Sequence, residues 1–196
     1  PLLIMINLFP TPINLIKNPN HSQIRDRYIN HCLNIPNQVP PGGQDWISKN
    51  VLNTFGTYSL WPDPVFEQLN TWIIGEVKKF KDNLGFGGGV EHFESWLNIY
   101  KKNYFQEWHN HNFALISAIY YLKTDKDSAK TWFKTPIPEN PNKPIFNENN
   151  PYTWEKYSID QEEGTLILFR SDLNHCVEAH PTDSVRITLA YNFKKN

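Results

Sequence analysis

Two histidines, His109 and His111, stand two residues apart at the start of the apolar stretch "HNHNFALISAIYYL". Alternate residues of a β-strand point to the same face, with a rise of about 3.3 Å per residue. We therefore expect both imidazoles to project side by side from a strand, close enough to hold one metal ion. A His-x-His pair alone is more often a surface or capping feature, so the prediction depends on a third ligand from another strand, which would complete a facial set with open positions.

The candidates for the third ligand are His175 and His180, which both lie in "RSDLNHCVEAHPTDSVRITLAYNF". His175 begins an expected strand that follows "GTLILF", whereas His180 precedes a proline where a turn is expected. We therefore predict that His175 is the ligand. Cys176 would point to the opposite face of the same strand and is not counted as one.

An arginine, Arg186, lies inside the apolar run "VRITLAYNF". A buried arginine is costly unless it meets an anion. Thr188 would share its face, and a guanidinium with a nearby hydroxyl suits a carboxylate ligand. The alternative is an internal ion pair of Arg186 with a nearby Asp or Glu, such as Asp172 or Glu178, which is the more common arrangement for a single arginine in a strand.

The second half of the chain carries the strands that would position these residues. Short apolar runs rich in Ile, Val, Tyr, Phe, Trp and Thr are separated by Gly, Pro, Asn and Asp, as is typical of strands and turns. Such a series favours a sandwich or barrel over a wound parallel sheet. The Pro- and Asn-rich segment 135–152 is predicted to be a long loop, either a variable surface loop or a lid. We expect strands at 93–100, 113–122, 129–134, 153–158, 164–169, 174–179 and 184–193.

The first half is predicted to be helical. Ser22 can cap a helix over about 22–33, which Pro36 would stop. Asp63 can cap a second helix, with Pro64 at its first position. Apolar residues recur at three- and four-residue steps in both, so each helix has one face to cover, and a sheet is the expected partner. These residues are Ile24, Tyr28 and Cys32 in the first helix and Val65, Leu69, Trp72, Ile73, Val77 and Phe80 in the second.

Bulk properties limit the class of protein. The 196 residues, 39% of them hydrophobic, suffice for one compact domain, which we place at 1–196. Nineteen basic and 20 acidic residues without a basic stripe argue against a nucleic-acid partner, and no apolar run is long enough for a membrane span. The first nine residues lack signal-peptide features, with Met5 a candidate native start. Cys32 and Cys176 are expected to be free thiols in a reducing, cytoplasmic compartment.

Four passages together resemble the Fe(II)- and 2-oxoglutarate-dependent oxygenases, which have a double-stranded β-helix (jelly-roll) core. They are "INLFPTPI", "SWLNIYKKNYFQEWHNHN", "LISAIYYLK" and "GTLILFRSDLNHCVEAH…VRITLAYNF". The chain looks closest to a family found in bacteria and in phages of marine cyanobacteria, and the resemblance covers nearly all of it. It implies an α+β, mainly β fold with a cupin-like core, supporting helices from the N-terminal half, and the cytoplasm of a bacterium or of an infected host cell.

The resemblance also implies roles for single residues. His109 looks like the first iron ligand and His175 like the distal one. Arg186, helped by Thr188, looks like the anchor for the distal carboxylate of 2-oxoglutarate. Tyr100 precedes His109 by nine residues, where related hydroxylases have a tyrosine that bonds the same carboxylate, and an aromatic residue of the core is the alternative.

The chain departs from most of the superfamily at the second ligand. Most members have a carboxylate two residues after the first histidine, where this sequence has His111. The closest family resembles this sequence in having His-x-His, so we take His111 as the second ligand. Three neutral imidazoles would leave the ferrous ion with its full double charge, which favours an anionic co-substrate. Glu107 and, more distantly, Asp172 are the rival ligands.

The activity implied by the resemblance uses Fe(II), 2-oxoglutarate as co-substrate and O2. It couples oxidative decarboxylation of 2-oxoglutarate to oxidation of a substrate, with hydroxylation expected. The substrate, either a small molecule or a peptide side chain, and the oligomeric state are unknown from the sequence. Two alternatives differ in class: a three-His cupin-like metalloprotein without 2-oxoglutarate, and a non-enzymatic jelly-roll binding or structural protein.

Overall fold

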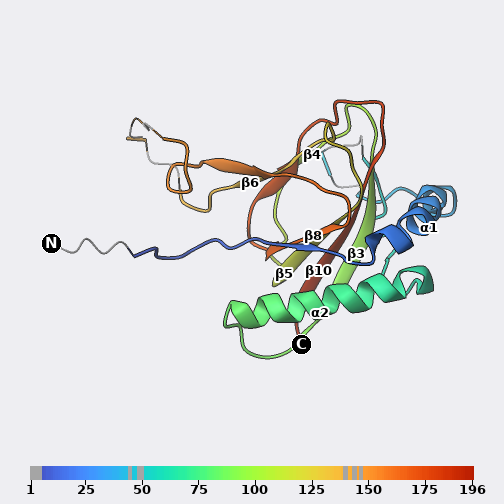
Figure 1. The fold of residues 1–196 in the computed structure, drawn as a ribbon, viewed down its shortest axis with the longest axis horizontal. Coiled ribbons are helices and arrows are strands. Elements are labelled where there is room, and N and C mark those ends of the chain that lie inside the picture. Colours follow the sequence, from blue (N-terminus) through green and yellow to red (C-terminus); the bar gives the residue numbers. More distant parts are fainter. Residues whose placement is uncertain (1–5, 44–45, 48–50, 139–140, 143–144, 146–147) are drawn as a thin grey trace.

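Two antiparallel β-sheets form the body of the protein (Figure 1). The computed structural model describes residues 6–43, 46–47, 51–138, 141–142, 145 and 148–196. Within them, the larger sheet runs in spatial order through β1 (Asn14–Lys17), β8 (Thr165–Arg170), β5 (Ile116–Lys123), β10 (Arg186–Lys195), β3 (Val90–Tyr100) and β2 (Leu52–Asn53). The smaller sheet runs through β4 (Gln106–His109), β9 (His175–Val177), β6 (Thr131–Lys134) and β7 (Lys156–Ile159).

The predicted strands are confirmed, because each of the seven expected segments overlaps one of β3 and β5 to β10, with ends that differ by up to three residues. Three further strands, β1, β2 and β4, were not expected and have at most four residues each. The expected loop 135–152 joins β6 to β7. Its residues 139–140, 143–144 and 146–147 lie outside the described part, and its other residues form no helix or strand. Its role as a lid stays a prediction.

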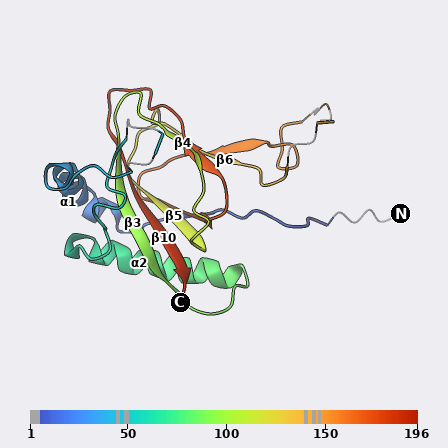
Figure 2. The ribbon, with the colours of Figure 1, turned by 180° about the vertical axis from the view of Figure 1, so that it is seen from behind.

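Two helices, α1 (His21–Asn34) and α2 (Glu67–Asn83), pack against one face of the larger sheet (Figures 1 and 2). The predicted start of α2 is confirmed: Asp63 accepts a hydrogen bond from the Val65 N–H at 2.8 Å, and Pro64 opens a short 3₁₀ turn that leads into the helix. The predicted cap of α1 is wrong, because the helix begins at His21 with Asn20 before it, so Ser22 lies inside the first turn.

The apolar face of each helix is as predicted, with Ile24, Tyr28 and Cys32 of α1 and Leu69, Ile73, Val77 and Phe80 of α2 buried. Among the described residues, neither helix has the length and apolar character needed to cross a bilayer.

Strand β10 separates the two sides of the larger sheet. Its odd-numbered residues, from Ile187 to Phe193, belong to the apolar core beneath the helices. Its even-numbered residues, from Arg186 to Asn192, line a pocket on the opposite face. Because side chains alternate along a strand, one ten-residue segment supplies both the core that holds the helices and one wall of the pocket.

His92 on β3 is a half-buried imidazole at the edge of the core with a lowered pKa. Its ring stacks on Trp61, with centroids 4.4 Å apart, and Phe193 meets both rings edge-on. Its Nε2 has no hydrogen-bond partner among the described residues. Burial lowers the pKa of His92 to about 4.

We expect His92 to make the fold less stable in mild acid. Between the ordinary pKa of about 6.5 and the folded-state pKa of about 4, the unfolded chain binds a proton that the folded chain does not. Protonation of His92 should therefore lower the free energy of unfolding of the protein by about 1–2 kcal/mol as the pH drops from 7.5 to 5. His92→Phe keeps the stacking and removes the proton, so urea unfolding should give a smaller pH-dependent loss. Equal losses in the two proteins would contradict this account.

Candidate metal centre

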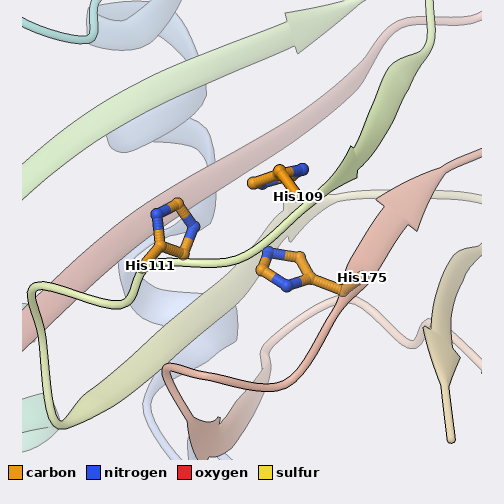
Figure 3. A group of neighbouring side chains, drawn as sticks. All are labelled: His109, His111 and His175. Atoms are coloured by element: carbon orange, nitrogen blue, oxygen red, sulfur yellow. The ribbon is translucent and has the colours of Figure 1, made fainter. Parts of the chain in front are cut away.

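Three histidines come together between the two sheets. His109 at the end of β4 pairs with His175 at the start of β9, and directly opposed residues of antiparallel strands project to the same face. Their ring centroids are 4.2 Å apart, and the His111 ring lies 5.0 Å from one and 5.2 Å from the other. One nitrogen from each ring lies within 4.8 Å of the other two. Figure 3 shows the three rings gathered around one space.

His111 reaches this cluster by a different route from the one predicted. It does not share a strand with His109, because β4 ends at His109 and the chain then turns (Figure 3). The backbone N–H of His111 donates to the Ser171 carbonyl at 2.8 Å, and its carbonyl accepts from the Ala114 N–H at 2.9 Å. These two bonds fix the turn, so the His111 ring meets the others from a loop.

Two of the rings are oriented by backbone carbonyls. Nδ1 of His109 donates to the Glu107 carbonyl at 2.7 Å, and Nδ1 of His175 donates to the Leu173 carbonyl at 3.0 Å. A histidine that ligates a metal typically donates its other ring N–H in this manner, which fixes the tautomer. Nε2 of both rings is then left as a lone-pair donor to the shared space.

Burial keeps all three imidazoles neutral. It lowers the pKa of His109, and with the neighbouring His109 it lowers the pKa of His111 to about 3. Burial and the two neighbouring imidazoles hold the pKa of His175 well below its usual range. The neutral imidazole is the form that binds a metal. The tautomers, charge state and spacing of these residues therefore fit a metal ion of the kind that imidazoles prefer.

The rival ligands lie outside the cluster. The Glu107 carboxylate accepts hydrogen bonds from the Ile47 N–H at 2.9 Å and from Nε2 of Gln106 at 2.8 Å. The register of β4 against β9 is irregular between Gln106 and His109, so Glu107 does not share the face of His109 as it would in a regular strand. The Asp172 carboxylate pairs with Arg170.

His180 and Cys176 also stay apart from the cluster. His180 is fully buried, where its Nδ1 accepts from the Ala129 N–H and its Nε2 lies 2.8 Å from the Ser184 carbonyl. Cys176 is a half-buried free thiol. Among the described His, Cys, Asp and Glu residues, only the three histidines form a group of this kind.

A pocket between the sheets extends from the histidines to Arg186. Arg186 is fully buried. Its Nε donates to Oε1 of Gln161 at 3.0 Å, and its Nη2 donates to the Thr131 hydroxyl at 3.1 Å. The guanidinium lies 4.7 Å from the Tyr100 ring and 5.4 Å from the Tyr121 ring. Nη1 has no partner among the described residues.

Arg186 forms no internal ion pair with a described residue, so the alternative of a pair with Asp172 or Glu178 is wrong. Asp172 pairs with Arg170, and Glu178 accepts from Nε1 of Trp132 and from the Lys130 N–H. Both carboxylates are engaged by other donors, and the contacts of Arg186 described above are all neutral. A buried positive charge without a counter-ion is costly, so the pocket is suited to an anion.

Register places Tyr100 and Thr188 beside this arginine. Tyr100 on β3 is the direct cross-strand partner of Arg186, and Thr188 faces the same pocket two residues along β10. Both are buried. Burial raises the pKa of Tyr100 to about 12, so its hydroxyl stays protonated at neutral pH and can donate a hydrogen bond.

Several polar residues that line the pocket were not predicted from the sequence. Asn98 and Trp96 continue the pocket face of β3 from Tyr100 at two-residue steps, and Gln106 begins β4. Oδ1 of Asn98, Nε1 of Trp96 and Oε1 of Gln106 are buried without a hydrogen-bond partner among the described residues. Counting back from Tyr100 in steps of two along the strand places Asn98 and Trp96 on the same face as Tyr100. No such pattern in the sequence marks Gln106 as a pocket residue.

This chain matches a protein family in sequence and solved structures in fold. The family described as "Putative 2OG-Fe(II) oxygenase" matches residues 94–192, which are 99 of the 196 residues and include all three histidines and Arg186. No protein with a curated description matches the chain by sequence.

Solved structures share the fold at low sequence identity. A prolyl-4-hydroxylase of Pseudomonas putida is 14% identical with a TM-score of 0.66, over 95% of this chain and 94% of that one. The viral collagen prolyl hydroxylase of Paramecium bursaria Chlorella virus-1, solved with 2-oxoglutarate, is 14% identical with a TM-score of 0.61, over 94% and 96%. HygX of Streptomyces hygroscopicus, solved with nickel, 2-oxoglutarate and hygromycin B, is 13% identical with a TM-score of 0.65, over 95% and 84%.

These similarities confirm the expected mainly β, double-stranded β-helix fold with its supporting helices. The family uses Fe(II), 2-oxoglutarate and O2, and the chain belongs to it: this protein is a 2-oxoglutarate- and Fe(II)-dependent oxygenase.

Proposed function

We propose that this oxygenase hydroxylates its substrate, with Fe(II) held by His109, His111 and His175. The observation that carries the proposal is one pocket with two complementary ends. At one end three neutral imidazole nitrogens share a space, and at the other the Nη1 of a fully buried guanidinium has no partner among the described residues. A dicarboxylate with a metal-chelating keto acid group fits both ends.

Arg186 would anchor the far carboxylate of 2-oxoglutarate. Its Nη1 has no partner among the described residues, and Arg186 lines the pocket, so a charge-assisted hydrogen bond there would compensate the buried charge. The protonated Tyr100 hydroxyl and the Thr188 hydroxyl would donate to the same carboxylate. This end of the pocket therefore fixes the position of the co-substrate and excludes water from it.

Charge favours the same co-substrate. The three imidazoles bring no negative charge to the metal, and Arg186 adds a positive one, so the pocket complements a dianion. When bound, Fe(II) and 2-oxoglutarate supply the activation of O2 that oxidises a C–H bond and releases succinate and CO2. The carbonyls of Glu107 and Leu173 keep two of the imidazoles in the ligating tautomer.

The alternatives predict other features. A cupin-like metalloprotein without 2-oxoglutarate would pair Arg186 with an internal carboxylate, and a structural jelly roll would satisfy its histidines within the core. Instead, the polar contacts of Arg186 are to a hydroxyl and an amide. Hydrogen bonds among the described residues reach Nδ1 but not Nε2 of His109 and His175.

We further propose a cytoplasmic location. Cys32 and Cys176 are both free, which agrees with a reducing compartment.

Anaerobic titration with Fe(II) and then 2-oxoglutarate tests the metal centre. We expect a weak visible metal-to-ligand charge-transfer band when both are bound. His175→Ala should lose it, because removal of one of three ligands weakens metal binding by at least about tenfold. Glu107→Gln and His92→Phe are matched controls, a carboxylate and an imidazole outside the cluster, and should keep the band. Loss of the band in Glu107→Gln but not in His111→Ala would identify Glu107 as the second ligand instead.

Replacement of the arginine tests the co-substrate end. Arg186→Met should raise the Kd for 2-oxoglutarate on the order of 100-fold, since a buried charge-assisted pair is lost. In the Fe(II)-loaded wild type, 2-oxoglutarate at 100 times its Kd should add about 2.7 kcal/mol to the free energy of unfolding, and the variant should show no such gain at that concentration. Arg170→Met, at an exposed arginine, is the control. An unchanged Kd in Arg186→Met would reject the assigned role.

A further inference from the structure

A second, larger pocket of about 410 Å³ opens beside the histidines. It shares Trp46, Gln106, His109 and His111 with the pocket that leads to Arg186. The two pockets therefore meet at the metal centre. Under the proposed function, on which this inference rests, the inner pocket holds 2-oxoglutarate and the larger one is placed for the substrate to be oxidised.

Aromatic rings form much of the wall of the larger pocket. Trp46 packs on Phe55, with centroids 5.6 Å apart, and lies nearly parallel to the His109 ring at 6.4 Å. Phe93 and Phe113 also line the pocket, and they are 41% and 90% exposed. Large apolar side chains left exposed around a pocket mark a binding surface.

The charged residues of this wall have one sign. Glu94 and Glu107 line the pocket, and its described lining contains no lysine or arginine. Both carboxylates are held in place: Nδ2 of Asn192 donates to Glu94 at 2.7 Å, and the Ile47 N–H donates to Glu107 at 2.9 Å. Aromatic faces together with carboxylates attract an organic cation and repel an anion.

Gln106 adds an independent requirement for a hydrogen-bond donor. Its side chain is 4% exposed, and its Oε1 has no partner among the described residues. Its Nε2 donates to Glu107 at 2.8 Å, which fixes the amide orientation and leaves the oxygen as the unsatisfied atom. The carboxylate and keto oxygens of 2-oxoglutarate can only accept hydrogen bonds, so the co-substrate cannot satisfy it.

We propose that the larger pocket binds the primary ammonium group of a cationic substrate, with an aliphatic stem lying against Trp46. Gln106 Oε1 accepts one ammonium N–H, and Glu94 and Glu107 neutralise the charge. A lysine side chain and a free alkylamine share this chemistry. The pocket thereby selects against anionic substrates, although the inner pocket selects for an anionic co-substrate.

Calorimetric titration of the wild type with matched probes tests the charge preference without any variant. The probes are the N-acetyl, N-methylamide derivatives of lysine, norleucine and glutamate, together with n-butylammonium. Each is titrated with and without Fe(II) and 2-oxoglutarate under anaerobic conditions. We expect the lysine probe to bind about tenfold more tightly than the norleucine probe, and the glutamate probe not to bind. Stronger binding of the lysine probe than of butylammonium indicates a peptide side chain, and the reverse indicates a small amine.

Variants then locate the preference within the pocket. Glu107→Gln, Glu94→Gln and Gln106→Leu should each weaken binding of the lysine probe several-fold and leave binding of the norleucine probe nearly unchanged. Glu162→Gln removes an exposed carboxylate elsewhere, paired with Lys17, and should change neither. Trp46→Ala should weaken both probes, whereas Trp154→Ala on the β6–β7 hairpin should weaken neither.

The outcomes separate this inference from the proposed function. Equal affinity for lysine and norleucine probes, or tight binding of the glutamate probe, overturns the cation site even if the charge-transfer band forms. A lysine preference that persists while no band forms supports the cation site and rejects the oxygenase roles of the histidines and Arg186.

Discussion

A buried positive charge that has no counter-ion among the described residues is the constraint on which the rest of this structure depends. Arg186 is fully buried at the start of β10, an interior strand of the larger sheet. Its polar contacts are a threonine hydroxyl and a glutamine amide, with two tyrosine rings beside it. Neutral dipoles and ring faces reduce the cost of burial but do not cancel the charge. Within the described residues this charge is uncompensated, and a bound carboxylate would neutralise it.

The register of three strands determines what surrounds that charge. Arg186 lies opposite Tyr100, and two residues further along, Thr188 lies between Asn98 on β3 and Tyr121 on β5. On the other face of the same strands, apolar side chains pack under α1 and α2. A shift of one residue in this register would exchange the two faces, so the helices that cover the core also hold the pocket residues in position.

The three histidines join two pockets of opposite electrostatic character. The inner pocket ends in Arg186 and the outer one presents carboxylates and Gln106. In the described part of the chain, a donor of Arg186, Nη1, and an acceptor of Gln106, Oε1, have no partner. Three neutral imidazoles separate them. An acidic co-substrate and a basic substrate would each be directed to its own pocket, with both reaching the same metal.

Sequence alone determined the residue types and the elements that carry them. Alternation predicted the strands, helical periodicity predicted the two helices, and the apolar context of Arg186 predicted its burial, because these signals are local.

Only the tertiary structure decided which side chains meet. Asn98 and Trp96 line the pocket because β3 pairs with β10. Trp46 and Gln106 line it because segments distant in the sequence pack together. His111 joined the cluster from a loop held by Ser171, and an irregular register removed Glu107 from it. Contacts of this kind depend on strand register and loop closure between remote segments, which no local pattern of residues encodes.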